Sequence, residues 1–130
     1  MQIYVFRRET FELIYDYQQM PTRVSAKKST LGRRLRQARE RAQLPQDRLG
    51  VLAGLEESSS SARISRYESG IHEPPALFAQ ALARVLGVPV AYLYCEDDRL
   101  AEIILAYSGM SEAQRESLLT TSSTLSKLNI

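Results

Sequence analysis

At 130 residues, the chain is long enough for one folded domain with appended segments, and its 44% hydrophobic and 25% charged residues are typical of a globular protein. The single cysteine excludes an intramolecular disulfide and a cluster of thiolate metal ligands. Charged residues interrupt every apolar stretch near the N-terminus, so we expect a cytoplasmic protein that makes no contact with a membrane.

The net charge of +2 conceals an uneven distribution. Between residues 23 and 41, only Glu40 opposes a run of basic residues: Arg23, Lys27, Lys28, Arg33, Arg34, Arg36, Arg39 and Arg41. After Tyr94, acidic residues outnumber basic ones. This asymmetry predicts a basic segment that faces a polyanion and an acidic segment that faces water or a partner. A basic helix face that is simply solvated is the alternative interpretation.

The first thirty residues have no consistent periodicity. Residues 3–6 fit a short strand, whereas residues 11–17 fit either a strand or one face of a short helix. Residues 22–30 are polar and basic, which is typical of a flexible arm. We therefore expect an uncertain, partly flexible N-terminal extension at 1–30, a domain at 31–94 and a C-terminal helical extension with a tail at 95–130.

The pattern becomes helical from residue 31. Apolar residues recur there at the spacing of one helix face: Leu31, Leu35, Ala38 and Ala42. Thr30 is the predicted N-cap of this helix, and Pro45 ends it because proline disfavours helical geometry in the residue before it. A second short helix is predicted at 45–53, with Gly54 as its cap or turn residue.

Three further helices are predicted between residues 58 and 94. The third begins within the serine run at 58–61 and stops at Gly70, since serine favours helix starts and glycine favours helix ends. Pro75 opens a fourth helix that Gly87 ends, and a short fifth helix covers 89–94.

The C-terminal segment predicts two more helices. Asp97 or Asp98 caps the first of them, and Ser111 with Gln114 forms a capping-box pattern before the second. The Ser/Thr-rich tail from Thr120 is expected to fray. The globular part is therefore predicted to be all-α.

The third helix carries the residues most suited to a binding role. Ile64 and Tyr67 are its buried candidates, and the positions around them hold small hydroxyl-bearing residues and two arginines. Arginine can donate two hydrogen bonds to guanine, and serine can contact either base edges or phosphates. This composition favours a helix that lies in the major groove of DNA, although a surface helix with incidental polarity would have a similar sequence.

Two segments carry a resemblance to a known family: LPQDRLGVLAGL at 44–55 and ISRYESG at 64–70. They resemble the Cro/C1-type helix-turn-helix of lambda-repressor-like regulators, the XRE family. In that family L-S/T-Q-x-x-L-A-x-x-A-G is followed by a turn and I-S-R/K-I/W/Y-E-x-G. The resemblance extends from Leu31 to about Leu93. It implies a lambda-repressor-like DNA-binding domain of about five helices.

The resemblance also assigns roles to matched residues. Gln46, in the second helix, would bind a DNA phosphate together with the free N–H groups at the start of that helix. Arg39 and Glu68 would form a partly buried ion pair between the first and third helices. The remaining DNA-binding candidates lie on the third helix: Ser60, Ser61, Ala62, Arg63, Ser65 and Arg66.

The chain departs from the family pattern at three places. Residues 55–60 make the turn about four residues longer, so that either the third helix starts earlier or the loop bulges. Gly50 replaces the usual alanine where the second and third helices approach. After Gly70, residues 71–73 are Ile-His-Glu where basic residues are usual. The N-terminal arm and three arginines of the first helix are expected to compensate: Arg33, Arg34 and Arg36.

Enzymatic and metal-binding functions find little support in the sequence. His72 is the only histidine and has no second metal ligand at a useful spacing, so it is interpreted as a surface loop residue. Cys95 has no neighbour that would activate a thiol. Asp97 and Asp98 are explained by helix capping. We expect no catalytic residues, no metal and no cofactor.

These observations predict a sequence-specific binder of double-stranded DNA that acts as a transcriptional regulator, a repressor, rather than an enzyme. A homodimer on two half-sites about 34 Å apart would supply affinity. Apolar residues of the C-terminal helices form the dimer surface or else cover the core: Leu100, Ile103, Ile104, Tyr107, Leu118 and Leu119. The alternative is an antitoxin-like interaction module, in which these helices bind another protein and DNA binding is secondary.

Overall fold

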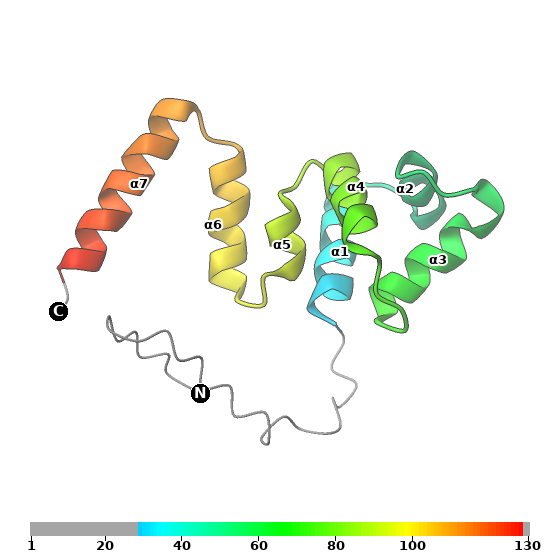
Figure 1. Cartoon of the computed structure of the whole chain (residues 1–130). Helices are drawn as coiled ribbons and strands as arrows, with labels where there is room; N and C mark the ends of the chain where they lie inside the picture. The colour runs from blue at the N-terminus through cyan, green and yellow to red at the C-terminus, as the bar shows by residue number, and fades with distance from the viewer. Residues whose placement is uncertain (1–28, 129–130) are drawn as a thin grey trace, which may run out of the picture.

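A computed structural model describes residues 29–128, which form seven helices and no strand (Figure 1). The predicted all-α class is therefore confirmed for this part of the chain. The helices are α1 Thr30–Arg41, α2 Gln46–Leu52, α3 Glu57–Ser69, α4 Ala76–Leu86, α5 Val90–Tyr94, α6 Asp98–Ser108 and α7 Glu112–Lys127. Most of the predicted N-terminal extension, with Arg23, Lys27 and Lys28, lies outside the described residues.

The first five helices share one hydrophobic core. Each contributes one large aliphatic side chain with 0% exposure: Leu35, Leu49, Ile64, Leu82 and Leu93. Burying a side chain of this size stabilises a fold by roughly 1.5–3 kcal/mol. Detaching any one of these helices from the core would therefore lose at least this much stability. We call residues 29–95, which contain these helices, the head.

The boundaries of the first two helices differ slightly from those predicted. The N-cap of α1 is Ser29, whose Oγ accepts a hydrogen bond from the Gly32 amide at 3.0 Å. Thr30, the predicted cap, is instead the first residue of the helix. Pro45 has an extended backbone and precedes α2 rather than forming its first turn.

Helix α3 begins at Glu57, before the serine run that was predicted to start it. Four of the residues that lengthen the family's turn, 57–60, are therefore helical, and the connection from α2 stays short. The helix ends where expected, because Gly70 takes a left-handed conformation with φ of 80°. The longer turn is thus resolved as an earlier helix start and not as a bulged loop.

The C-terminal helices carry the caps that the sequence indicates. Asp97 accepts a hydrogen bond from the Leu100 amide at 2.8 Å, and Ser111 forms a complete capping box with Gln114. Fraying from Thr120 was predicted wrongly, since α7 continues to Lys127. Hydroxyl groups in this part of α7 donate to carbonyl oxygens of the preceding turn, so the polar side chains are compatible with a helix.

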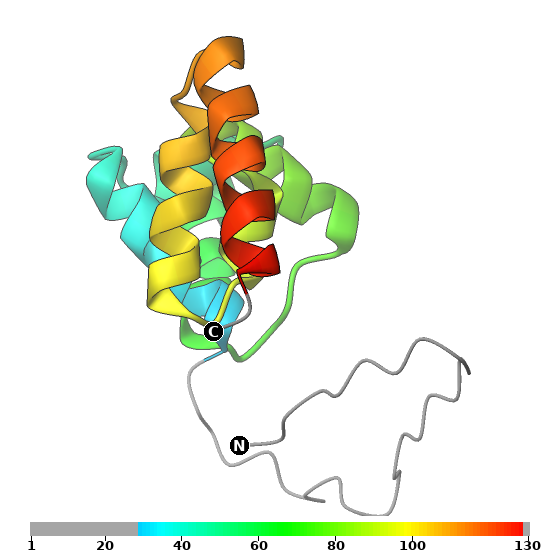
Figure 2. The same ribbon diagram turned by 90° about the vertical axis from the view of Figure 1, so that its left-hand side faces the viewer.

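Helices α6 and α7 relate to the head in different ways. One side of α6 reaches the core through the buried Ala101, and the partly buried Ile104 packs beside it. In α7 no residue is buried. Figure 2 shows the two helices side by side and running in opposite directions. None of the described helices is long and apolar enough to cross a bilayer.

Candidate nucleic-acid interface

Helices α2 and α3 meet through a glycine and a serine. Ser60 has 0% exposure, and its hydroxyl donates to the Asp47 carbonyl at 2.6 Å. A Cβ atom added to Gly50 would overlap the Ser60 hydroxyl, so the two helices approach more closely here than an alanine at position 50 would allow. Glycine at position 50 therefore leaves the space that the Ser60 hydroxyl occupies.

The burial of Ser60 corrects one predicted site residue. Ser60 was placed among the DNA-facing residues, but it lies four positions before Ile64 and therefore on the same face of the helix. Because α3 begins as early as Glu57, Ser60 is already part of the helix and shares the buried face of Ile64. Ser60 holds α2 against α3 and is not available to a ligand.

The other five candidates on α3 all lie on its outer surface: Ser61, Ala62, Arg63, Ser65 and Arg66. The buried side of the helix is formed by Ser60, Ile64, Tyr67 and Glu68. Because successive helical residues turn by about 100°, Ala62 and Arg66 point most directly away from that side. Figure 1 places α3 on the opposite side of the head from α6 and α7.

Helix α3 and the loop that follows it form a pocket of about 470 Å³. It is lined by Ser59, Arg63, Arg66, Tyr67, His72 and Glu73. The loop is held there because the His72 amide donates to the Arg66 carbonyl at 3.3 Å. His72, which the sequence suggested was a plain surface residue, thus lies with both candidate arginines. In the sequence, the only indication of this placement was that His72 lies two residues after Gly70, which ends α3.

An ion pair ties α3 to α1 behind this surface. Arg39 donates through Nε to Oε1 of Glu68, and through Nη2 to its Oε2 at 3.3 Å. The Gln46 side-chain amide donates to the same Oε2 at 3.0 Å. The Glu68 side chain is only 6% exposed, so it is a structural anchor shared by three helices. Gln46 is the first residue of α2. It lies beside the backbone N–H groups that cannot form hydrogen bonds within the helix.

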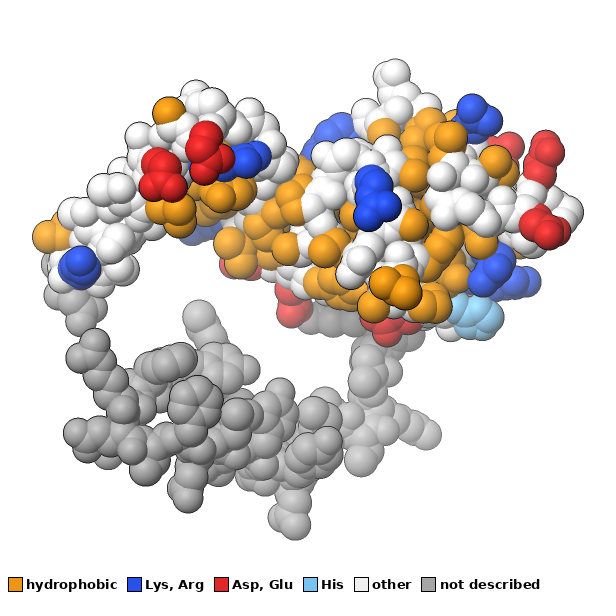
Figure 3. Space-filling model, turned by 45° about the horizontal axis from the view of Figure 1, so that its top comes forward, with side chains coloured by type: hydrophobic (Ala, Val, Ile, Leu, Met, Phe, Trp, Pro, Cys, Tyr) orange, Lys and Arg blue, Asp and Glu red, His pale blue; other side chains and the backbone are white. Residues whose placement is uncertain are grey.

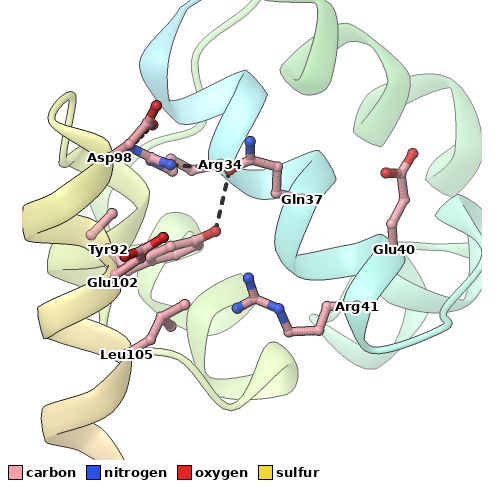
Figure 4. A pocket seen from close by; sticks show the side chains of 9 residues that line it. Arg34, Gln37, Glu40, Arg41, Tyr92, Asp98, Glu102 and Leu105 are labelled. Carbon is pink, nitrogen blue, oxygen red and sulfur yellow. Dashed lines mark hydrogen bonds and ion pairs between the residues drawn. The ribbon is translucent and has the colours of Figure 1, made fainter.

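Two arginines of α1, Arg33 and Arg34, bind the start of α6, and Figure 4 shows Arg34 beside Asp98. Arg33 and Arg34 donate to the Asp98 carboxylate at 2.9 and 2.8 Å. Arg34 is 4% exposed and also donates to the Cys95 carbonyl at 2.8 Å. The hydrogen bond from Arg33, followed by that from Arg34, holds the pKa of Asp98 below its ordinary value. The expectation that these two arginines compensate at DNA is therefore wrong for Arg34, which is buried at this junction.

A second pocket of about 430 Å³ lies at the same junction, between α1, α5 and α6. Figure 4 shows Arg34 between Gln37 and Asp98, with Tyr92 below. The Tyr92 hydroxyl donates to Gln37 at 3.4 Å, and the Arg34 guanidinium lies 5.5 Å from the Tyr92 ring centroid. These contacts join α5 to α1 within the head, and the ion pair from the same Arg34 to Asp98 attaches α6 to it.

Comparison with known proteins agrees with this geometry. The family model described as a helix-turn-helix domain matches residues 30–93. The crystal structure of the transcriptional regulator BswR is 43% identical, with a TM-score of 0.69, over 72% of this chain and 92% of that chain. The chain belongs to the helix-turn-helix transcriptional regulators. No curated protein matches its sequence.

The family places the site within the regulator. The matched residues 30–93 are α1 to α5, so the domain coincides with the head. Within it, α2 and α3 are the two helices of the helix-turn-helix. The inference from segments 44–55 and 64–70 that the chain is a helix-turn-helix regulator is confirmed, and the regulator is a DNA-binding protein.

Proposed function

We propose that the regulator binds a specific sequence of double-stranded DNA by placing α3 in the major groove. The observation that carries this proposal is the outer surface of α3, where Arg63 and Arg66 are exposed above a fully packed core. Arg66, which points further outward than Arg63, is suited to donate two hydrogen bonds to guanine. Ser65 can contact base edges or phosphates, and the Ala62 methyl group suits a thymine methyl.

The start of α2 supports a neighbouring phosphate contact. Gln46 is the first residue of this helix, and its N-cap Pro45 offers no side-chain hydrogen bond to the free N–H groups. A DNA phosphate would accept hydrogen bonds from these groups. The bond from Gln46 to Glu68 holds this side chain at the start of the helix, which supports the proposed contact. We also assign the regulator to the XRE family, which the motif residues at 44–55 support.

We further propose that the regulator acts as a homodimeric repressor, since a dimer bound to two half-sites would exclude other proteins from that DNA. The candidate dimer surface is the apolar side of α6 that does not reach the core. It includes Leu100 and Ile103, about half exposed, and Tyr107. Figure 3 shows hydrophobic side chains exposed along the C-terminal helices. A DNA-binding role fits the cytoplasmic location expected from the sequence.

The test is to select bound fragments from a pool of random duplex DNA and to measure affinity for the enriched fragments. Arg66→Ala is expected to lower affinity by about 1–3 kcal/mol if Arg66 contacts a base. Arg99→Ala is the matched control, because Arg99 is exposed on α6, away from α3. Equal affinity of a folded Arg66→Ala variant would remove Arg66 from the interface.

An antitoxin-like interaction module is the second candidate function. The same exposed apolar side chains of α6 and α7 favour it, because a different protein could cover them instead of a second copy. A stoichiometric partner that co-purifies with the chain, together with no enrichment of any duplex at low salt, would support this function. A symmetric enriched site would support the homodimer.

A further inference from the structure

His72 stands beside the proposed DNA-contacting arginines on a fixed backbone. The hydrogen bond from its amide to the Arg66 carbonyl anchors the loop to the last turn of α3. The side chain itself is exposed and lines the same pocket as Arg63 and Arg66. The imidazole therefore lies on the same side of α3 as the two arginines.

The charged and titratable groups around His72 come from two elements. Helix α3 contributes Arg63, Arg66 and the phenol of Tyr67, and the loop contributes Glu73. Two of these groups are cationic guanidinium groups, and the loop adds one carboxylate. A DNA phosphate that enters the pocket brings a further negative charge against the arginines.

Histidine differs from arginine because it gains its charge between roughly pH 8 and pH 5. A neutral imidazole has one N–H donor, whereas the protonated ring has two donors and a positive charge. A nearby phosphate favours the protonated ring, so DNA binding at this position takes up a proton. Linkage then requires that affinity for DNA rises as the pH falls.

We propose that His72 contacts a DNA backbone phosphate beside α3 and makes DNA binding dependent on proton concentration. This inference rests on the proposed function of α3 and adds a residue and a regulating variable to it. The chain contains one histidine, so no other imidazole can produce the same dependence. The chemistry recognised is a phosphodiester, and the contact is independent of base sequence.

The experiment compares wild type, His72→Gln and His72→Arg on one duplex enriched from the random pool at pH 7. Affinity is measured at pH 6 and pH 8, each at several salt concentrations. We expect wild type to bind roughly three- to tenfold more tightly at pH 6 than at pH 8, with a salt slope steeper by about one released ion. His72→Gln should show neither difference, and His72→Arg should keep the steeper slope at both pH values.

Identical pH dependence in wild type and His72→Gln would overturn the inference and leave the role of α3 intact. Failure of wild type to enrich any duplex would overturn the proposed function and this inference with it. Thermal unfolding of each variant without DNA shows whether a lost contact reflects lost structure. Because His72 is exposed and its hydrogen bond uses the backbone, we expect all three proteins to unfold at similar temperatures.

Discussion

The head and α7 differ in what holds them in place. Every helix of the head contributes a fully buried aliphatic side chain, whereas α7 buries none and leaves Leu119 and Leu125 more than half exposed. Helices of this length are marginal in water without packing. The head therefore has its own source of stability, which does not depend on the side chains of its outer surface. The C-terminal helices instead leave several large apolar side chains exposed, and only α6 reaches the core.

The largest expected effect lies at the anchor of the head. Glu68→Ala should lower the free energy of unfolding by about 3–5 kcal/mol, because it leaves the largely buried Arg39 guanidinium without its carboxylate. Denaturant unfolding measures this loss. Glu116→Ala, an exposed acid on α7, is the matched control and should change stability by less than about 0.5 kcal/mol. A small effect at Glu68 would mean that the ion pair does not anchor α3.

The core provides the second test of the comparison. Ile64→Ala should lower the free energy of unfolding by about 2–5 kcal/mol, since it leaves a cavity between α3 and the rest of the head. Leu125→Ala in α7 should change the unfolding of the monomer by less than about 0.5 kcal/mol. Both values come from denaturant titrations at protein concentrations where the chain is monomeric. Equal losses would show that α7 is packed in solution and would erase the difference between the two regions.

Much of the fold follows from local sequence. The apolar spacing of α1 and α4, the left-handed Gly70 and the Ser111–Gln114 capping box are properties of a few neighbouring residues, and each was predicted. The length of α7 was missed because its hydroxyl-rich sequence lowers helix propensity, while the hydroxyls bond to carbonyls of the preceding turn.

Whether a residue of α3 faces outward or inward could be predicted only where the start of the helix and its buried face were known. The outward position of Arg63 and Arg66 follows from the buried Ile64, but the burial of Ser60 depended on whether the extra residues joined α3 or its loop. The role of Arg34 could not be predicted, because its partner Asp98 lies 64 positions away along the chain. A basic run in a sequence does not distinguish arginines that face DNA from arginines that join helices.

The contact between α2 and α3 gives a smaller expected effect. Gly50→Ala should destabilise the head by about 1–3 kcal/mol, because the overlap with the Ser60 hydroxyl outweighs a gain in helix propensity of about 1 kcal/mol. Adding Ser60→Ala should recover part of the loss by removing the overlapping oxygen. A double-mutant cycle of unfolding free energies measures this coupling. Additive effects would contradict the fit between the two residues.

The smallest expected effect tests the contact that joins the head to α6. The hydrogen bonds from Arg33 and then Arg34 lower the pKa of Asp98, so the ionised carboxylate stabilises the folded state. A lowered carboxyl pKa adds stability that is present above the unfolded pKa, about 4, and is lost as the pH falls through the folded value. The advantage of wild type over Asp98→Asn should therefore persist at pH 7 and pH 5 and shrink at pH 3.

The size of this advantage is limited because the Asp98 side chain is 76% exposed and water screens the pair. Chemical denaturation of both proteins at the three pH values gives the comparison, and Asp97 remains available to cap α6 in each of them. If the difference between the proteins stays constant down to pH 3, hydrogen bonding rather than charge holds α6 against α1. The attachment of the C-terminal helices would then be insensitive to acid, unlike the proposed contact of His72 with DNA.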